Sequence, residues 1–296
     1  MELRHLRYFI TVAEELNFSR AAERLHIAQP PLSQQIRDLE IELGVKLFER
    51  TKRRVELTTP GKVFLEKSRL ALQQVEQAVI AVQKASRGEI GRLVIGFNSS
   101  ATYSILPKIL RVFREQCPDV ELDLQELTTR QQCDRLHHNQ IDVGILYLPI
   151  ESETLSTMTI LQESLILALA ATHPLAALPE VSIKALTQEP FIMPPHHLGG
   201  GLYNQILRFF QQTNFIPNVL QEATQLQTTI SLVAGSIGIA LVPASLQNLQ
   251  RSGVVYKTLQ EPTPEIEIAL AWRKQDSSPV LQNFINTVSL IHKSYL

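Results

Sequence analysis

Hydroxyl-bearing and glycine residues stand at the expected starts of several helices in the second half of the chain. The segments are Asn98-Ser99-Ser100, Thr128-Thr129, Glu222-Ala223-Thr224 and Gly199-Gly200-Gly201. A helix start offers unpaired backbone N–H groups and a partial positive charge, and both suit a carboxylate. For any one of these segments taken alone, a helix N-cap is a simpler interpretation than a binding site. Binding of an organic anion therefore requires a fold that brings several of these starts together.

A second set of polar side chains could read DNA. A helix expected from Pro30-Pro31 to Gly44 has an apolar stripe formed by Leu32, Ile36, Leu39 and Leu43. The same geometry turns five polar residues outward: Gln29, Ser33, Gln34, Arg37 and Asp38. Such side chains donate and accept hydrogen bonds, as the reading of base edges in a major groove requires.

The elements before this helix complete a helix-turn-helix. Residues 3–15 carry apolar side chains at three- and four-residue steps, which predicts an amphipathic helix. A short helix is expected to start near Ser19, a good N-cap residue, and to end by Ile27. Two short helices joined by a tight turn, the second with a polar face, are typical of DNA-binding proteins.

A basic segment follows and resembles a β-hairpin wing. Residues 46–58 have strand-like ends around Lys52, Arg53 and Arg54. These cations could contact phosphates or enter a narrow minor groove. A solvated basic turn is the alternative, and the preceding helix pair favours nucleic acid.

Three stretches carry a resemblance to a known family. They are FSRAAERLHIAQPPLSQQIRDLE (residues 18–40), LGVKLFER (43–50) and LTTPG (57–61). This sequence closely resembles the LysR-type transcriptional regulators over essentially the whole chain. The resemblance places Gln29, Pro30, Pro31, Ser33 and Gln34 against DNA, with Arg53 in the wing. Many relatives carry Arg where this chain has Gln34, so a charge-assisted contact is lost there. With the neighbouring polar and basic residues, the predicted DNA-binding set is Gln29, Pro30, Pro31, Ser33, Gln34, Arg37, Lys52, Arg53 and Arg54.

Residues 59–87 are expected to form a long linker helix. Apolar or small residues recur at alternating steps of four and three: Phe64, Ser68, Ala71, Val75, Ala78, Val82 and Ala85. This seam predicts packing on a partner helix, and the family dimerises through this helix. Packing on the chain's own body is the alternative. Two glycines within residues 86–91 then indicate a hinge, which we place at residues 88–92.

The remainder, residues 93–296, alternates between strand and helix patterns. The expected strands are 92–97, 120–126, 141–146, 165–170, 191–193, 219–222, 239–242 and 267–272, and the expected helices are 105–116, 131–138, 202–213, 225–234 and 279–293. The alternation predicts two α/β lobes with a largely parallel sheet. The resemblance implies that the last strand and helix return to the first lobe, as in periplasmic solute-binding proteins. Lobe I is then about residues 93–162 and 268–296, and lobe II about 163–267.

The fold class is therefore α+β overall, with a winged helix-turn-helix over residues 1–58, a linker helix and a two-lobed α/β effector domain. The resemblance implies an effector between the lobes, and relatives bind one at positions equivalent to Ser99, Ser100 and Thr129. The candidate effector-binding residues are Ser99, Ser100, Thr129, His196, His197, Gly200 and Thr224. His196 and His197 could equally pair with a carboxylate or cap their loop. The first guess for the effector is an aromatic carboxylate or a muconate-like diacid.

Composition narrows the remaining classes. Residues 1–87 hold 15 Lys and Arg against 11 Asp and Glu, whereas residues 88–296 hold 13 against 18, so a net charge of -1 conceals a basic head. Two cysteines, Cys117 and Cys133, are too few for a disulfide framework. The Cys133 and His137 pair is a weak metal candidate, so we expect no metal and no cofactor besides the effector. No catalytic motif appears, so we expect no enzyme and no catalytic residue.

We therefore expect a cytoplasmic regulator without a secretory signal or membrane span. Its expected partners are double-stranded promoter DNA, further copies of itself in a homodimer or homotetramer, and a small organic acid. RNA polymerase is a further candidate. The alternative function is a cytoplasmic small-molecule-binding module that does not bind DNA.

Overall fold

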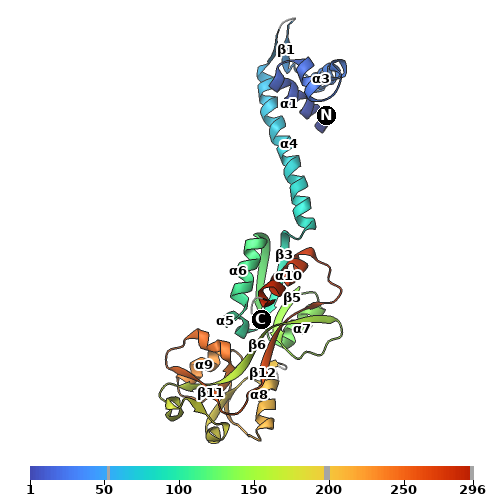
Figure 1. Ribbon diagram of the computed structural model, residues 1–296. Coiled ribbons are helices and arrows are strands. Elements are labelled where there is room, and N and C mark those ends of the chain that lie inside the picture. Colours follow the sequence, from blue (N-terminus) through green and yellow to red (C-terminus); the bar gives the residue numbers. More distant parts are fainter. Residues whose placement is uncertain (52–53, 197–200, 294–296) are drawn as a thin grey trace. The chain divides into compact units, whose positions relative to one another are not determined.

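Three helices and a two-stranded hairpin form the core of the first unit of the chain (Figure 1). The computed structural model describes residues 1–51, 54–196 and 201–293, and it divides into two units, Met1–Lys84 and Ala85–Leu296. The elements of the first unit are α1 (Leu3–Glu15), α2 (Phe18–Arg24), α3 (Gln29–Leu43), β1 (Phe48–Arg50), β2 (Val55–Leu57) and α4 (Thr59–Ser86). No helix of the described residues is both long and apolar enough to cross a membrane.

Aromatic rings hold this first unit together. Phe9 of α1 packs against Phe48 of β1 and Phe64 of α4, with ring centroids 5.3 and 4.9 Å apart. Three of the four residues of the apolar stripe expected for residues 30–44 are buried, because Leu32, Ile36 and Leu39 are at most 1% exposed, and the fourth, Leu43, is half-buried. Burial of several such side chains on one helix is what fixes α3 against α1 and α2.

The helix ends follow their capping residues. Helix α2 starts at Phe18, one residue before Ser19, and its cap is Asn17, which accepts hydrogen bonds from the N–H groups of Ser19 and Arg20. In α3 the two prolines lie in the first turn, and Gly44 ends the helix in the left-handed conformation at φ 67°. The expected stop at Gly44 is therefore confirmed.

The second unit contains an eight-stranded sheet with the order β4-β3-β5-β12-β6-β11-β7, and β10 also pairs with β6. The strands are β3 (Ile90–Phe97), β4 (Asp119–Glu126), β5 (Val143–Tyr147), β6 (Leu155–Ala170), β7 (Glu180–Val181), β8 (Pro190–Met193), β9 (Asn218–Glu222), β10 (Ala240–Pro243), β11 (Val254–Leu259) and β12 (Glu265–Arg273). The helices are α5 (Ser99–Tyr103), α6 (Leu106–Gln116), α7 (Thr129–His137), α8 (Gly201–Gln212), α9 (Leu226–Ala234) and α10 (Pro279–Lys293), with short 3-10 helices η1 (Pro174–Ala177), η2 (Ile183–Leu186) and η4 (Ala244–Leu249).

Helices cover both faces of the first lobe. Side chains of α6 and α10 share one core with Ile145 of β5, and the rings of Phe113 and Phe284 meet edge to face at 5.1 Å. The next residue, Leu146, joins Leu136 of α7 in a separate core on the other face. The last strand and helix lie in the first lobe, since β12 pairs with β5 and α10 packs on α6 (Figure 1).

The expectation of a largely parallel sheet is only half right. Strands β4, β3 and β5 are parallel, as are β8 with β9 and β7 with β11. The pairs β5–β12, β6–β12, β6–β10 and β6–β11 are antiparallel. The reason is the 16-residue strand β6, of which only residues 165–170 were expected. It runs from the first lobe into the second, and β12 returns alongside it in the opposite direction.

Candidate functional sites

The outer side of α3 presents most of the residues predicted to read DNA. Gln29, Pro30, Pro31, Gln34 and Arg37 are all exposed. The Gln34 amide donates to the Asp38 carboxylate at 2.8 Å, so one turn of the helix holds it in place. The exposed row thus carries amide, guanidinium and carboxylate groups that can pair with base edges and phosphates.

Ser33 does not turn outward as expected. It is only 9% exposed, and its hydroxyl accepts a 2.7 Å hydrogen bond from the Gln29 amide. A residue four positions after Gln29 lies directly beneath it on the helix, so the short serine is covered by the longer side chain. Ser33 therefore orients Gln29.

Glu40 ties the hairpin to α3. Its carboxylate accepts from the backbone N–H groups of Leu47 and Phe48 at 2.9 and 3.0 Å and pairs with Arg50 at 2.9 Å. The Arg50 guanidinium in turn lies 4.6 Å from the centre of the Phe18 ring. Glu40 is not visible as a functional residue in the sequence, although its carboxylate anchors the hairpin to α3 and so positions the wing.

Of the predicted wing cations, Arg54 is described, and Lys52 and Arg53 lie outside the described residues. Arg54 is 74% exposed and pairs with Glu56, two residues further along in β2. The N–H of Thr51 donates to the carbonyl of Arg54 at 2.9 Å, which closes the base of the loop.

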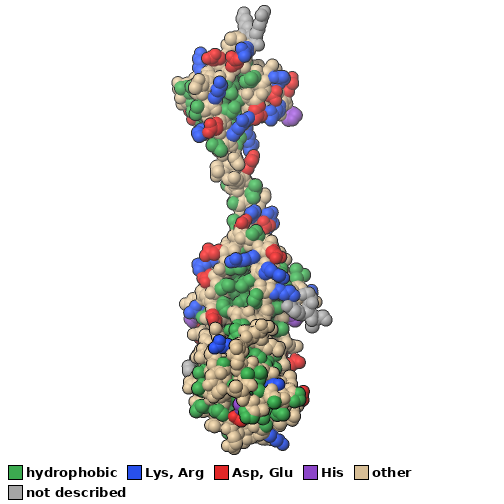
Figure 2. Space-filling model, turned by 90° about the vertical axis from the view of Figure 1, so that its left-hand side faces the viewer, with side chains coloured by type: hydrophobic (Ala, Val, Ile, Leu, Met, Phe, Trp, Pro, Cys, Tyr) green, Lys and Arg blue, Asp and Glu red, His purple; other side chains and the backbone are tan. Residues whose placement is uncertain are grey.

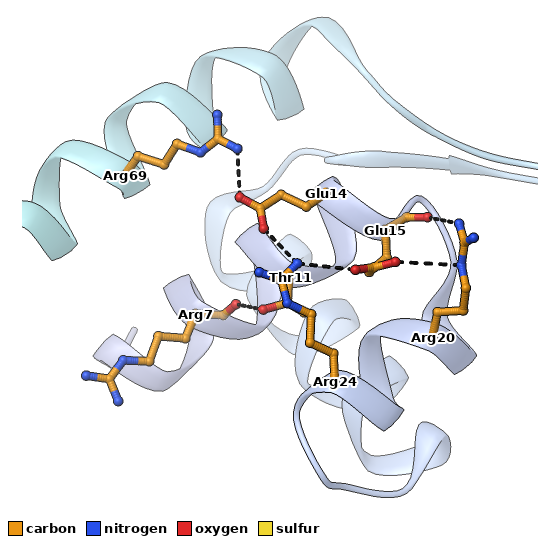
Figure 3. Close-up of polar contacts among 7 residues, drawn as sticks. All are labelled: Arg7, Thr11, Glu14, Glu15, Arg20, Arg24 and Arg69. Carbon is orange, nitrogen blue, oxygen red and sulfur yellow. Dashed lines mark hydrogen bonds and ion pairs between the residues drawn. The ribbon is translucent and has the colours of Figure 1, made fainter.

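An ion network joins the helix-turn-helix to the linker helix (Figure 3). The Glu14 carboxylate contacts Arg69 of α4 at 2.8 Å and Arg24 of α2 at 2.9 Å, and Arg24 also reaches Glu15 at 3.2 Å. The hydrogen bond from Arg69, more than the pairing with Arg24, holds the pKa of Glu14 below its ordinary value. Arg24 is thus committed to acidic partners within the protein.

The linker helix exposes the later part of its expected seam, including Ala78, Val82 and Ala85. Among its 28 residues only Gly61 and Ser68 are buried, and Val79 and Val82 are 53% and 70% exposed. On the face drawn in Figure 2, hydrophobic side chains lie along this helix. An apolar helical stripe of this kind needs a partner.

The second unit encloses a cavity of about 350 Å³ at the carboxyl ends of β3 and β4. Its lining residues are Asn98, Ser99, Glu126, Leu127, Thr128, Thr129, Gln131, Tyr147, Ile192, Pro194, Pro195, Leu202, Tyr203, Ala223, Thr224, Gln225, Leu226, Thr229 and Leu241. The loops after β3, β4, β8 and β9 all contribute, so the cavity lies between the two lobes. Open α/β sheets bind ligands at such strand ends.

The fold brings three of the predicted effector residues together, since Ser99, Thr129 and Thr224 line the cavity. Ser100 does not line it: this residue is fully buried and its hydroxyl donates to Asn98 Oδ1 at 2.9 Å. His196 is exposed and packs edge to face on Tyr203 with ring centres 5.2 Å apart. His197 and Gly200 lie outside the described residues.

Helix α7 points its start into this cavity. Thr128 and Gln131 form a capping box, in which the Thr128 hydroxyl accepts from the Gln131 N–H and Gln131 Oε1 accepts from the Thr128 N–H. Within the described part of the chain, the N–H groups of Thr129 and Arg130 have no hydrogen-bond partner. Two free N–H groups at the positive end of a helix suit one carboxylate.

Gln132 fixes α7 against the sheet. It is fully buried, and its amide donates to the carbonyls of Leu127 and Ile145, both at 3.1 Å. The side chain lies over Gly96 and Gly144, where a Cβ atom would stand 3.1 and 2.7 Å from it. Neither Gln132 nor Glu126 stands out in the sequence, because only the tertiary structure places Gln132 over the two glycines and Glu126 at the cavity.

Comparison with known proteins decides the family. Residues 3–62 match the model of the bacterial regulatory helix-turn-helix protein, lysR family, and residues 86–289 match the LysR substrate binding domain. This chain belongs to the LysR family of transcriptional regulators. Among such regulators, AlsR of Bacillus subtilis (strain 168) is 43% identical over 97% of this chain and 95% of its own, and the Hca operon transcriptional activator HcaR of Escherichia coli (strain K12) is 38% identical over 97% of each.

Solved structures of LysR-type regulators agree with this assignment. Full-length CbnR complexed with its target DNA has a TM-score of 0.86 at 27% identity and covers 99% of this chain and 100% of its own. Full-length BenM has a TM-score of 0.63 at 33% identity and covers 100% and 98%. The chain is therefore a DNA-binding regulator with an effector-binding domain, and it is not an enzyme.

Proposed function

We propose that this regulator binds promoter DNA through the exposed face of α3 and its wing, and that a small organic acid in the interlobe cavity changes DNA binding and bending. The observation that carries the proposal is one chain holding both parts: a polar, solvent-exposed α3 and a cavity with an unpaired helix start. An effector acts only if it binds one arrangement of the protein better than another.

The exposed seam of α4 supports a paired assembly. A homodimer would cover Val79 and Val82 and present two α3 helices to two half-sites. Association of two such dimers into a homotetramer is part of the proposal. A role as activator, the word used in the name of HcaR, would require contact with RNA polymerase.

The proposed target is an operon for the metabolism of aromatic or other small acids. A cavity of about 350 Å³ has the size of sites for small ligands, and Tyr147 and Tyr203 in its wall suit an aromatic ring. An aromatic carboxylate and a muconate-like diacid were the two classes expected from the sequence. Their different charges make them separable by experiment.

DNA binding over a salt series tests the first half of the proposal. Contacts to phosphates release counterions, so log affinity falls linearly with log salt at a slope of about 0.9 per phosphate. Arg37→Ala should weaken promoter binding by about tenfold, as loss of one good base or phosphate contact does, and Arg111→Ala, an exposed arginine of α6, serves as the control. Promoter binding that is insensitive to salt and to Arg37→Ala would leave the alternative of a ligand-binding module without DNA.

A further inference from the structure

The cavity wall carries one carboxylate and, among its described residues, no Lys, Arg or His. The carboxylate belongs to Glu126, the last residue of β4, which stands in register with Phe97 at the end of the parallel strand β3. Burial first and the Glu126 charge second raise the pKa of the Tyr103 hydroxyl, which places this charge near α5. Glu126 is exposed, so a dicarboxylate in this cavity would meet one solvent-accessible negative charge and no described basic side chain.

Asn98, one residue beyond β3, supplies the opposite kind of group. It is 6% exposed and lines the cavity, and its Oδ1 accepts from the Ala101 N–H and the Ser100 hydroxyl at 3.1 and 2.9 Å. These two bonds fix Nδ2 as the other end of the amide, and Nδ2 is buried without a partner among the described residues. A buried donor without an acceptor is costly, and a carboxylate oxygen satisfies it.

The acceptor and the donors therefore stand on one wall. Neighbouring strands lie about 4.8 Å apart, so residues that end β3 and β4 can contact two polar groups on adjacent carbon atoms of one ligand. The wall from the second lobe contributes most of the apolar side chains: Ile192, Pro194, Pro195, Leu202, Leu226 and Leu241. Thr224, Gln225 and Thr229 are polar side chains on that wall. A ligand that fits has its charged head toward the first lobe and a mainly apolar body toward the second.

We infer that the effector is a small monocarboxylate with an ammonium or hydroxyl group on the carbon next to the carboxylate, and that the cavity rejects dicarboxylates. The carboxylate accepts from Asn98 Nδ2 and the free N–H groups that begin α7. The neighbouring ammonium or hydroxyl donates to Glu126. This inference rests on the proposed function, because it assigns a chemical class to the same cavity.

Four probes that differ only in the group on the carbon next to the carboxylate test this preference: phenylalanine, 3-phenyllactate, 3-phenylpropanoate and benzylmalonate. They carry an ammonium, a hydroxyl, a hydrogen or a second carboxylate at the same position. Calorimetric titration of the full chain should give the tightest binding for phenylalanine or phenyllactate. Benzylmalonate should bind at least about tenfold more weakly than 3-phenylpropanoate, because its second charge lies close to Glu126.

Two variants assign these preferences to residues. Glu126→Gln should remove the advantage of phenylalanine over 3-phenylpropanoate and improve benzylmalonate by about tenfold, whereas Glu121→Gln, a 74% exposed carboxylate on the same strand, should change neither. Asn98→Asp keeps a good helix cap but replaces the donor with a charge, so all four acids should bind at least about tenfold more weakly.

The outcomes separate this inference from the proposed function. Benzylmalonate binding as tightly as phenylalanine, or an unchanged rank order in Glu126→Gln, overturns the inference and leaves an acid-binding cavity in place. No binding of any probe at millimolar concentration overturns the inference together with the effector half of the proposed function. Salt-dependent promoter binding, measured separately, would still stand in that case.

Discussion

Gly88, at the junction of the linker helix and the effector domain, is expected to tolerate no side chain. It has a φ of 69°, and a Cβ atom there would lie 2.4 Å from the carbonyl carbon of Pro279 and 2.6 Å from the nitrogen of Val280. Both atoms belong to the backbone of the first turn of α10, so no side-chain rotation relieves the overlap. The sequence predicts a hinge at residues 88–92, whereas the structure packs its first glycine tightly against a helix.

The cost of Gly88→Ala follows from two separable terms. A left-handed backbone costs an alanine about 1–2 kcal/mol. Moving the start of α10 also endangers the two hydrogen bonds that the Asn283 amide donates to the carbonyls of Arg87 and Gly88, at 2.7 and 3.2 Å. Each is worth about 1 kcal/mol. The expected loss in the free energy of unfolding is therefore about 3–4 kcal/mol.

Gly253→Ala is the matched control. Gly253 has a φ of 84°, in the same unit, and the nearest atoms to its added Cβ are 3.9 Å away. This variant should lose only the backbone term of about 1–2 kcal/mol. Trp272, the one tryptophan of the chain, lies in β12 and reports urea unfolding of this unit by its fluorescence. Equal unfolding midpoints for the two variants would refute the claim that α10 confines Gly88.

Two further predictions concern the ion network and the buried glutamine. In a double-mutant cycle, Glu14→Gln and Arg69→Met should show a coupling of about 0.5–1 kcal/mol in thermal unfolding followed by helical circular dichroism at pH 7. Because the pKa of Glu14 is lowered in the folded state, this coupling is present above the ordinary carboxyl pKa of 4.5 and is lost as the pH falls through the lower pKa of the folded state. Additive effects of the two substitutions at pH 7 would contradict the predicted coupling. Gln132→Met leaves two buried carbonyls without their donor, so the free energy of unfolding measured in urea should fall by about 2–3 kcal/mol. Carboxylate probes should also bind this variant more weakly. A loss of unfolding free energy below about 0.5 kcal/mol would show that the amide does not hold α7 against the sheet.

Periodicity and capping residues predicted many local elements of this chain. The helix expected at 279–293 is found at those residues, and the helices expected at 105–116 and 202–213 are each found within one residue at their ends. Strand β6 was half missed because polar and apolar residues in its first part, residues 155–164, pair with β12 rather than forming an apolar run. Whether β6 and β12 pair parallel or antiparallel depends on the lobe to which the chain returns, and no local sequence pattern encodes that return.

The site residues divide along the same line. Helix starts are visible in the sequence, so Ser99, Thr129 and Thr224 were found. The orientation of a hydroxyl within such a start is not visible, because a serine can point to solvent or be covered by its own helix, as Ser33 and Ser100 are. Glu126 could not be found in this way, because it reaches the cavity only through the pairing of β4 with β3.

Strand β3 connects the cavity to the residues that follow the linker helix. The strand begins at Ile90, two residues after the glycine that packs against α10, and ends at Phe97, next to the cavity residue Asn98. Eight residues of strand extend about 26 Å, and β4 pairs with all of them while β5 pairs with the last three, Ile95–Phe97. A ligand hydrogen-bonded to Asn98 therefore acts on one end of β3, and the other end of β3 follows the linker helix.

If this strand carries the coupling, a Gly88→Ala variant, in which the packing of Gly88 on α10 is lost, should keep its affinity for a carboxylate probe. It should lose the effect of the probe on DNA affinity, and by linkage it should lose the effect of DNA on probe affinity to the same degree. Retention of both effects would show that the coupling runs through another part of the effector domain.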